Sequence, residues 1–373
     1  MLKDKLFIFL ILAIIIASFI IIDLPRTIFV VRGDFLKNVS EIDEVKIVEK
    51  KPVYSKGIYI TFRTAGTKRV DEILELIKRT ELNTIVIDIK DYTGRIPFDT
   101  NSEFIDSIGA EQIHIKDIRG LVDKFKNEGI YTIARIVVFE DNYLPSVMPE
   151  LALKNIDGSL WRDNRGLSWF DPSSKEVWDY VVDLSRAAVK VGFDEINLDY
   201  IRFPTDGNLS NIRYPFWDGI TPKKEVIRQF FQYFSSRIKP MNVFISADLF
   251  GLTLTSQNDL NIGQWLEYAG EFFDYICPMT YPSHYYPGHK GFENPAAYPY
   301  ETIYDELVVG NQRLASSSAK IRPWLQDFDL GANYDANMIN SQKQAVYDSN
   351  SYGWLFWNPR NVYTEDGFQH VEE

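Results

Sequence analysis

The sequence predicts an α/β fold, a (β/α)8 TIM barrel preceded by a single N-terminal transmembrane helix. Two observations predict the barrel: short β-rich apolar runs alternate with helical patterns, and the longest connections all follow predicted strands. A third observation, an unbroken apolar run near the N-terminus, predicts the helix. The expected parts are a signal anchor at residues 1–23, a tether at 24–51 and the barrel at 52–373.

The N-terminal apolar run covers residues 6–22 and contains no charged residue, proline or glycine. Its length is at the short end of what spans a bilayer, roughly 17–25 residues, and exceeds the usual apolar core of a cleaved signal, about 7–15 residues. The bulky isoleucines at its end do not form a small-residue cleavage site, which favours an uncleaved anchor. Because an N-terminal anchor usually sends the rest of the chain across the membrane, we expect a single-pass protein of the cell membrane with an extracytoplasmic barrel.

Eight runs have the composition of buried strands, and helical segments between them carry apolar residues at the i, i+3, i+4 and i+7 spacing. The predicted strands are residues 57–61, 84–90, 131–138, 195–199, 244–248, 275–279, 321–325 and 353–357. No G-x-G-x-x-G follows the first strand, which weakens the alternative of an open doubly wound sheet. Four apolar stripes are expected to pack helices onto the outside of the barrel: Val70, Ile73, Leu74 and Ile77; Ile118, Leu121, Val122 and Phe125; Val177, Tyr180, Val181 and Leu184; and Ile227, Phe230, Phe231 and Phe234.

The connections are unequal in length, and the long ones are at residues 91–114, 139–172, 202–221 and 280–295. Each of them follows a strand rather than a helix, so all four are expected on the C-terminal face of the barrel. Active sites of barrels of this kind are built on that face. The sequence therefore places a functional site there.

Composition excludes several classes of function. The net charge of −12 argues against a nucleic-acid partner, because a phosphate backbone would be repelled. Cys277 is the single cysteine, so an internal disulfide is impossible. Among the four histidines the nearest pair is His284 and His289, with no third ligand spaced nearby, so we expect neither a metal site nor a cofactor.

The densest run of polar residues is FDEINLDYIRFPTDG, at residues 193–207. Glu195, Asn197 and Asp199 alternate along the fourth predicted strand and are expected to point the same way. Asp199 would lie at the strand end, with Arg202 nearby, and strand-end carboxylates on this face of a barrel are usually catalytic. The structural alternative is an Asp199–Arg202 pair that caps the rim.

The fifth predicted strand ends in a similar way, because Ser246 and Asp248 share a face and Asp248 is at the strand end. Asp199 and Asp248 are thus expected across one pocket. Cleavage of a glycosidic bond needs two such carboxyl groups, one protonated and one ionised. Asp248 could instead be the N-cap of a following turn.

Polar and aromatic residues recur at the other predicted strand ends. Aromatic rings suit the C–H faces of sugars, although any single ring could simply belong to the core. Several rings with carboxylates between them favour a sugar-binding cleft. The candidates for this cleft are Asp88, Lys90, Tyr281, Trp324, Gln326, Asp327, Trp357 and Asn358, together with Asn197 and Arg202.

Six stretches between residues 56 and 358, namely KGIYITFRTAG, NTIVIDIKDYTG, DEINLDYIRFP, CPMTYPSHY, RPWLQDF and GWLFWN, carry a family resemblance. With them the chain resembles a family of TIM barrels described as glycosyl hydrolase domains, distantly similar to the α-amylase superfamily. That resemblance implies a nucleophilic Asp after strand four, an acid/base after strand five and a further Asp after strand seven, positions that Asp199, Asp248 and Asp327 match. Two departures stand out: the superfamily's usual acid/base is Glu, and its usual Arg two residues before the nucleophile is here Asn197.

We therefore expect a membrane-anchored glycoside hydrolase that acts on an extracellular or cell-wall polysaccharide. Asp199 would be the nucleophile or principal carboxylate and Asp248 the acid/base, and Arg202 and Asp327 would orient or tune them. The expected linings of the sugar subsites are Tyr281, Trp324 and Trp357.

Two alternatives remain. The stretch DEINLDY is also similar to the D-x-x-D-x-D-x-E of chitinase-like barrels, but Ile201 replaces the closing Glu, so the substrate-assisted chitinase mechanism is not expected. The other alternative is a non-catalytic carbohydrate-binding or cell-envelope scaffold protein. Carboxylate geometry discriminates between scaffold and enzyme, because hydrolysis needs a second carboxyl group about 5–5.5 Å from Asp199 for retention or roughly 6.5–9.5 Å for inversion.

Overall fold

A computed structural model of the chain describes residues 50–371. Within this range no helix combines the length and the apolar character that crossing a membrane requires. The predicted anchor at residues 1–23 and nearly all of the tether at 24–51 lie outside the described residues.

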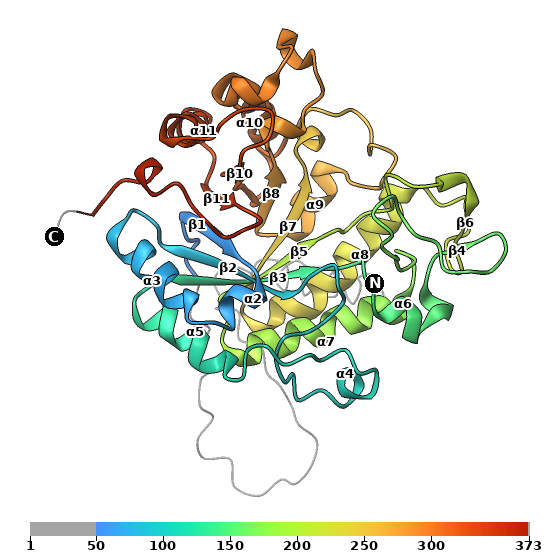
Figure 1. The fold of residues 1–373 in the computed structure, drawn as a ribbon. Helices are drawn as coiled ribbons and strands as arrows, with labels where there is room; N and C mark the ends of the chain where they lie inside the picture. The colour runs from blue at the N-terminus through green and yellow to red at the C-terminus, as the bar shows by residue number, and fades with distance from the viewer. Residues whose placement is uncertain (1–49, 372–373) are drawn as a thin grey trace, which may run out of the picture. The chain divides into compact units, whose positions relative to one another are not determined.

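The strands form one closed parallel barrel (Figure 1). Their order is β10-β11-β1-β2-β3-β5-β7-β8-β9, and a pairing of Trp324 in β10 with Met279 in β8 closes the ring. This confirms the (β/α)8 barrel that the sequence predicts. The barrel strands are β1 (Ser55–Ile60), β2 (Thr84–Lys90), β3 (Tyr131–Val137), β5 (Glu195–Asp199), β7 (Phe244–Phe250), β8 (Tyr275–Met279), β9 (Lys320–Ile321), β10 (Trp324–Gln326) and β11 (Gly353–Trp357).

The seventh strand position differs from the prediction, because β9 and β10 together occupy it. Arg322 and Pro323 separate the two pieces. Proline has no backbone N–H to donate to a neighbouring strand, so the ladder is interrupted there. The pairing resumes at Trp324, whose strand joins both β8 and β11.

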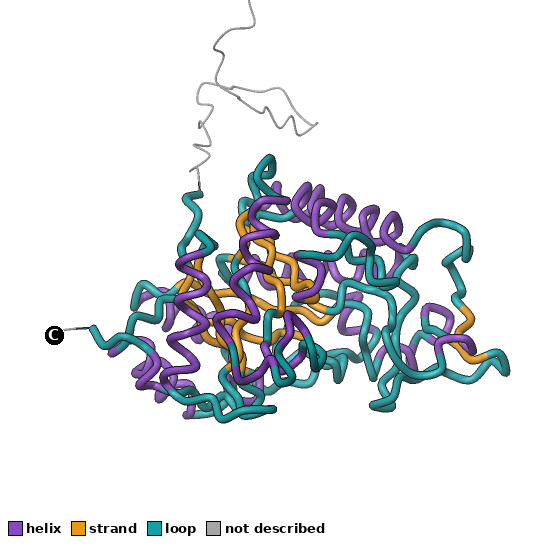
Figure 2. Tube along the Cα trace, turned by 90° about the horizontal axis from the view of Figure 1, so that it is seen from above, coloured by secondary structure: helices purple, strands orange, loops and turns teal. Residues whose placement is uncertain are grey.

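Helices follow the strands and cover the outside of the barrel (Figures 1 and 2). All sixteen residues of the four predicted apolar stripes are buried, on α3, α5, α7 and α8. Local signals set the helix ends: α7 begins after Ser174, whose hydroxyl accepts from the amide of Val177, and ends at Gly192 with φ of 118°. The helices are α2 (Phe62–Ala65), α3 (Arg69–Arg79), α4 (Glu103–Ser107), α5 (Ile118–Asn127), α6 (Leu144–Val147), α7 (Lys175–Val191), α8 (Lys223–Ile238), α9 (Leu266–Phe272), α10 (Pro299–Arg313) and α11 (Ala336–Asp348).

Two apolar layers result from the alternation of side chains along the strands. The larger one lies between strands and helices. The smaller one fills the interior of the barrel and includes Tyr59, Val86, Ile133, Cys277 and Leu355. At the carboxyl ends of β2, β3, β5 and β7 the inward-facing residues are polar, and these residues form the candidate site.

The long loops after β3 and β5 are joined to each other. β4 (Lys154–Asn155) in the first loop pairs antiparallel with β6 (Ile212–Arg213) in the second. Figure 1 shows this pair far out from the barrel strands. The pairing ties together two of the four loops that the sequence places on the functional face.

Candidate active site

Four ionisable side chains meet inside the barrel at the carboxyl ends of neighbouring strands. Asp88 of β2 and Arg135 of β3 are partners in the parallel register, and Asp199 of β5 is the register partner of Val137. Asp248 lies on β7, two residues beyond the partner of Asn197. Because all these strands run the same way, the four groups gather at one end of the barrel.

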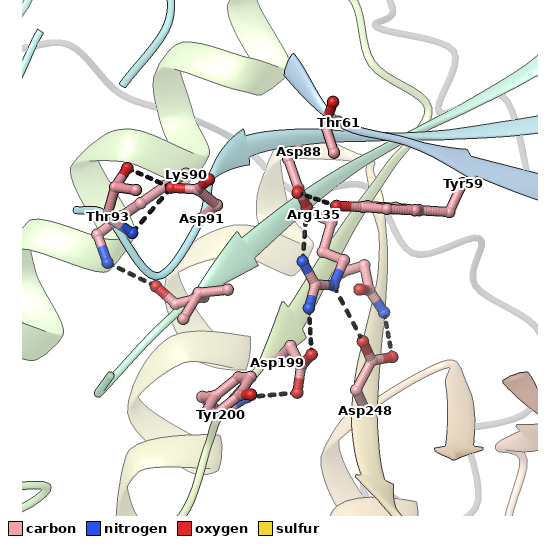
Figure 3. Close-up of polar contacts among 12 residues, drawn as sticks. Tyr59, Thr61, Asp88, Lys90, Asp91, Thr93, Arg135, Asp199, Tyr200 and Asp248 are labelled. Carbon is pink, nitrogen blue, oxygen red and sulfur yellow. Dashed lines mark hydrogen bonds and ion pairs between the residues drawn. The ribbon is translucent and has the colours of Figure 1, made fainter. Parts of the chain in front are cut away.

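The guanidinium of Arg135 is the centre of this cluster (Figure 3). Its Nη1 donates to Asp88 Oδ1 at 2.6 Å and its Nη2 donates to Asp199 Oδ2. Its Nε lies 3.6 Å from Asp248 Oδ2. One cation thus contacts three carboxyl groups from three strands, and we call these four residues the Arg135 cluster.

Asp248 is held by two neutral donors and is 1% exposed. Its Oδ1 accepts from Asn197 Nδ2 and from the indole N–H of Trp324, each at 2.8 Å. Within residues 50–371 its Oδ2 has no hydrogen-bond partner. Burial and the neighbouring charge of Asp199 raise the pKa of Asp248 to about 8, so this carboxyl group keeps its proton at neutral pH.

Asp88 and Asp199 have different surroundings. The Tyr59 hydroxyl donates to Asp88 Oδ2, and burial raises the pKa of Asp88 to about 6 against the opposing effect of Arg135. Asp199 Oδ1 accepts from the backbone amide of Tyr200 at 2.6 Å. Tyr200 has a φ of 53°, a conformation that costs energy for a non-glycine residue and that often marks functional sites.

Glu140 adds a fourth acidic group near Asp199, from the loop after β3. It is buried, and its Oε1 accepts from Arg165 Nη2 at 2.6 Å. Burial raises the pKa of Glu140 to about 7, and the charge of Asp199 acts in the same direction. Two carboxyl groups that can hold a proton, Asp248 and Glu140, therefore flank Asp199.

Three of these residues escaped the sequence reasoning: Tyr59, Arg135 and Glu140. Arg135 had a visible signal, because it is a charged residue within the otherwise apolar run YTIARIVV of a buried strand. Glu140 lies two residues after that run, in FED, and resembles an ordinary loop acid. Tyr59 is an aromatic residue in a β-rich run, where a core role is the common one.

Neither structural alternative for Asp199 and Asp248 describes what is seen. The carboxylate of Asp199 binds Arg135, whereas Arg202 donates to the carbonyl of Phe203 at 3.1 Å. Arg202 packs its guanidinium against the Trp169 and Phe250 rings, 4.9 Å from each centroid. Asp248 lies inside β7, and the following 3-10 turn begins after Phe250 rather than after Asp248.

Asp327 is outside the Arg135 cluster and faces the C-terminal segment. Its two carboxylate oxygens accept from the hydroxyl and the amide of Thr364, at 2.8 and 2.9 Å, and burial raises its pKa to about 6. Asn358 donates to the carbonyl of Asp327. Gln326 exchanges backbone–side-chain hydrogen bonds with Gln342, both at 2.8 Å. These three predicted site residues hold the segments after β10 and β11 in place.

Lys90 also lies apart from the cluster. Its Nζ pairs with Asp141 at 2.8 Å and donates to the carbonyl of Val137 at 2.7 Å, and both charged side chains are fully buried. This pair ties the loop after β3 to the end of β2.

The predicted aromatic residues divide into two groups. Trp324 is buried and orients Asp248 through its indole N–H. Tyr281 and Trp357 lie with ring centroids 5.9 Å apart, and Trp357 lies 6.1 Å from Tyr59, the residue that binds Asp88. These rings form an aromatic wall beside the carboxyl groups. Among residues 50–371, no group of three or more His, Cys, Asp or Glu side chains is arranged to hold a metal ion.

Comparisons with known proteins agree with this architecture. A family model described as "Putative glycosyl hydrolase domain" matches residues 57–363. The comparison with curated proteins found no match. Among solved structures, the PgaB (BpsB) glycoside hydrolase domain from Bordetella bronchiseptica is similar with a TM-score of 0.60 and 11% identity, over 82% of this chain and 94% of that one.

Two further structures are similar to parts of the chain. Alpha-L-fucosidase isoenzyme 2 from Paenibacillus thiaminolyticus matches with a TM-score of 0.57 and 14% identity, over 84% of this chain and 48% of that one. A hypothetical protein from Ruminiclostridium thermocellum is 37% identical, over 51% of this chain and 96% of that one, with a TM-score of 0.47. At their low identities the PgaB domain and the fucosidase show a shared fold.

Proposed function

We propose that this chain, which belongs to the glycosyl hydrolase domain family matched over residues 57–363, is a glycoside hydrolase that cleaves a polysaccharide. The observation that carries the proposal is the convergence of Asp88, Asp199 and Asp248 on the guanidinium of Arg135. Three buried carboxyl groups around one cation cannot all ionise without a large cost, so the site holds protonated and ionised groups side by side. Hydrolysis of a glycosidic bond requires that combination.

Asp199 is the ionised carboxylate in this proposal. Arg135 and the amide of Tyr200 bind its two oxygens and fix its orientation. From that position it either attacks the anomeric carbon or takes a proton from the attacking water. Fixed donors of this kind cost no reorganisation during the reaction.

The second requirement is a carboxylic acid that protonates the leaving oxygen. The sequence assigns this role to Asp248, which carries a proton at neutral pH because its pKa is raised to about 8. Since Asn197 and Trp324 occupy Oδ1, the proton belongs on Oδ2. Arg135 fixes the distance between the two carboxyl groups, because it contacts both.

The surrounding residues bind the sugar or support the site. The half-buried Trp357 offers a ring face for sugar C–H groups beside the cluster, and the buried Tyr281 supports that ring. Asp327, Gln326 and Asn358 support the segments that frame it. No cofactor takes part in the proposed reaction.

We further propose that the protein works at the outer side of the cell membrane, on an extracellular or cell-wall polysaccharide. The apolar run at residues 6–22 supports an anchor, and the charged stretch after it supports a tether. Expression of the full chain and of a version that lacks residues 1–23 tests this part. We expect the full chain to sediment with carbonate-washed membranes and the shortened one to be released. We also expect added protease to cleave the barrel in intact spheroplasts. A full chain in the soluble fraction would contradict the membrane anchor.

The hydrolase proposal is tested with the purified full chain, incubated with a panel of cell-wall and exopolysaccharides while new reducing ends are counted. Asp199→Asn serves as the test, and Asp183→Asn, at a partly exposed position on α7, serves as the matched control. We expect reducing ends from the wild type and from Asp183→Asn, and their loss in Asp199→Asn. Binding of a polysaccharide without release of reducing ends by the wild type would instead identify a carbohydrate-binding protein.

A further inference from the structure

Glu140 stands beside the strand end that carries Asp199. The backbone after β3 remains hydrogen-bonded to the backbone after β5, because Val138 N donates to Asp199 O at 2.9 Å and Phe139 N donates to Tyr200 O at 3.3 Å. In the sheet β5 lies between β3 and β7. Glu140 and Asp248 therefore approach Asp199 from opposite sides.

A rigid turn places Arg165 over Glu140. Gly166, with φ of 80°, donates its amide to the carbonyl of Asp163 at 3.0 Å and so closes the turn. The Asp163 carboxylate accepts hydrogen bonds from the backbone amides of Arg165 and Leu167, both at 2.9 Å. The segment after the turn pairs its backbone with Glu140, through an antiparallel bridge to Trp169. Backbone hydrogen bonds therefore hold both the turn that carries Arg165 and the segment that carries Glu140.

The charges around Glu140 nearly balance. The charged and titratable groups that face it are Arg165, Asp163, Arg202, Asp199 and Tyr200. Burial is the largest influence and raises the pKa of Glu140 to about 7; the guanidinium groups oppose this effect and the carboxylates reinforce it. A pKa close to neutral suits a group that must both give and take a proton.

Glu140 and Asp248 are both buried, 2% and 1% exposed, but they differ in the side chains that cover them. Asp248 is enclosed, with Oδ1 bound by Asn197 and Trp324 and with Oδ2 facing Arg135. The partner of Glu140 is Arg165, whose side chain is 54% exposed. A ligand at the mouth of the barrel can displace an exposed side chain far more easily than it can displace a buried cluster.

We propose that Glu140, rather than Asp248, passes the proton to the leaving oxygen, and that Arg165 is a positioning residue which holds Glu140 for this transfer. This inference rests on the proposed function. The bond from the anomeric carbon to the bridging oxygen breaks with its electron pair on the oxygen, which takes the proton from Glu140 Oε2. In a retaining course Asp199 bonds to the anomeric carbon as that bond breaks, and water then displaces Asp199, adds its hydroxyl to the sugar and gives its other proton to Glu140. In an inverting course water attacks as the bond breaks, its proton passes to Asp199 and then to solvent, and solvent restores the proton of Glu140.

The leaving group provides the test. The full chain and its Glu140→Gln and Asp248→Asn variants are compared on the polysaccharide found by the panel and on a 2,4-dinitrophenyl glycoside of the shortest oligosaccharide that is cleaved. A sugar hydroxyl needs a proton to leave, whereas dinitrophenolate does not. We expect Glu140→Gln to lower kcat/KM about 10²–10⁴-fold on the polysaccharide and less than about tenfold on the dinitrophenyl glycoside. Asp248→Asn should lower both values by the same factor, because it acts through Arg135.

The pH profile is the second readout. The wild-type kcat/KM on the polysaccharide should fall as pH rises above about 7, where Glu140 loses its proton. Arg165→Met removes a positive charge that opposes protonation, so the basic limb of the profile should move to higher pH.

The outcomes separate this inference from the proposed function. If the wild type turns over substrate and Glu140→Gln has an unchanged kcat/KM, or one lowered equally on both substrates, the role of Glu140 is overturned and the proposed hydrolase function stands. A leaving-group effect in Asp248→Asn alone returns the role to Asp248. A wild type without turnover on the whole panel overturns the hydrolase and this inference together.

Discussion

Two arginine–carboxylate clusters lie inside the same barrel, one at each end of the strands. At the amino ends, Arg322 binds both oxygens of Glu195, and each side chain is 0% exposed. Two hydroxyl groups also donate hydrogen bonds to the Glu195 carboxylate, Ser246 to Oε1 at 2.5 Å and Tyr131 to Oε2 at 3.1 Å. One positive charge meets one negative charge, and both carboxylate oxygens are satisfied.

At the carboxyl ends, Arg135 meets three carboxyl groups, and within the described residues one oxygen of Asp248 has no hydrogen bond. The two clusters use the same residue types on shared strands: Glu195 and Asp199 are both on β5. Their difference is the ratio of charges. A balanced pair leaves no buried charge uncompensated, whereas an excess of acid keeps protons and charge ready for chemistry.

The largest expected effect is on activity. Asp199→Asn should lower kcat/KM on the order of 10⁴-fold, because the amide can neither attack nor take a proton. Glu195→Gln, four residues earlier on the same strand, touches Asp248 only through Ser246 and Asn197 and should lower kcat/KM per folded molecule by less than about tenfold. Steady-state kinetics at equal concentrations of folded protein measure both. Equal losses in the two variants would mean that the two ends of β5 do not have separate roles.

The next largest effect is on stability, and here we expect the Arg322–Glu195 pair to be the more sensitive of the two clusters. Glu195→Gln leaves the Arg322 charge uncompensated in the interior and should lower the free energy of unfolding by about 3–5 kcal/mol. The exposed Arg228–Glu271 pair is the matched control, because Glu271→Gln should cost less than about 1 kcal/mol. Urea unfolding measures both. A cost for Glu195→Gln as small as that of the control would show that the buried pair is not a structural element.

Most of the fold could be predicted from the sequence because each barrel strand and its helix carry their own periodicity. All eight strand positions were found that way, and the apolar stripes of four helices are buried as expected. The break at Pro323 in the seventh strand and the two-residue strands β4 and β6 were missed. Strands of two residues are too short to show an alternating pattern.

The site was less predictable because contacts across the barrel leave little local trace. Asp199 and Asp248 meet because the ends of parallel strands always meet at one edge. Arg202 is closer to Asp199 in the sequence than Arg135 is, yet Arg135 is the partner. The chain turns at Tyr200, with φ of 53°, and carries Arg202 to an aromatic pocket instead. Positive φ at a tyrosine cannot be read from composition.

A moderate effect is expected on the pH dependence of stability. The pKa of Asp248 is raised to about 8 in the folded protein, so the folded state keeps a proton that the unfolded chain loses near pH 4. The free energy of unfolding should therefore fall as pH rises from about 4 to about 8, by at most about 1.4 kcal/mol per pH unit for this group. Asp248→Asn should reduce the fall between pH 5 and 8 by at least about 1 kcal/mol.

Urea unfolding at a series of pH values measures this slope. Asp183→Asn, on the outer surface of α7, should leave it unchanged. Glu140 and Asp88 contribute over narrower ranges, up to about pH 7 and about pH 6, so part of the slope should remain in Asp248→Asn. A slope identical to that of the wild type would mean that Asp248 is already ionised at neutral pH.

The smallest expected effect compares aromatic residues at the two ends of the barrel. Trp357 belongs to the wall beside the Arg135 cluster, whereas Tyr352 stacks on Tyr275 at the opposite end, with ring centroids 6.3 Å apart. If the wall binds sugar, Trp357→Ala should raise KM about 5- to 10-fold and change kcat little, since the loss of one ring contact is worth about 1 kcal/mol. Tyr352→Ala removes a ring of similar burial far from the carboxyl groups and should change neither constant. A rise in KM in both variants would point to a loss of packing. A fall in kcat in Trp357→Ala without a change in KM would mean that this ring shapes the Arg135 cluster through Tyr59 instead of holding substrate.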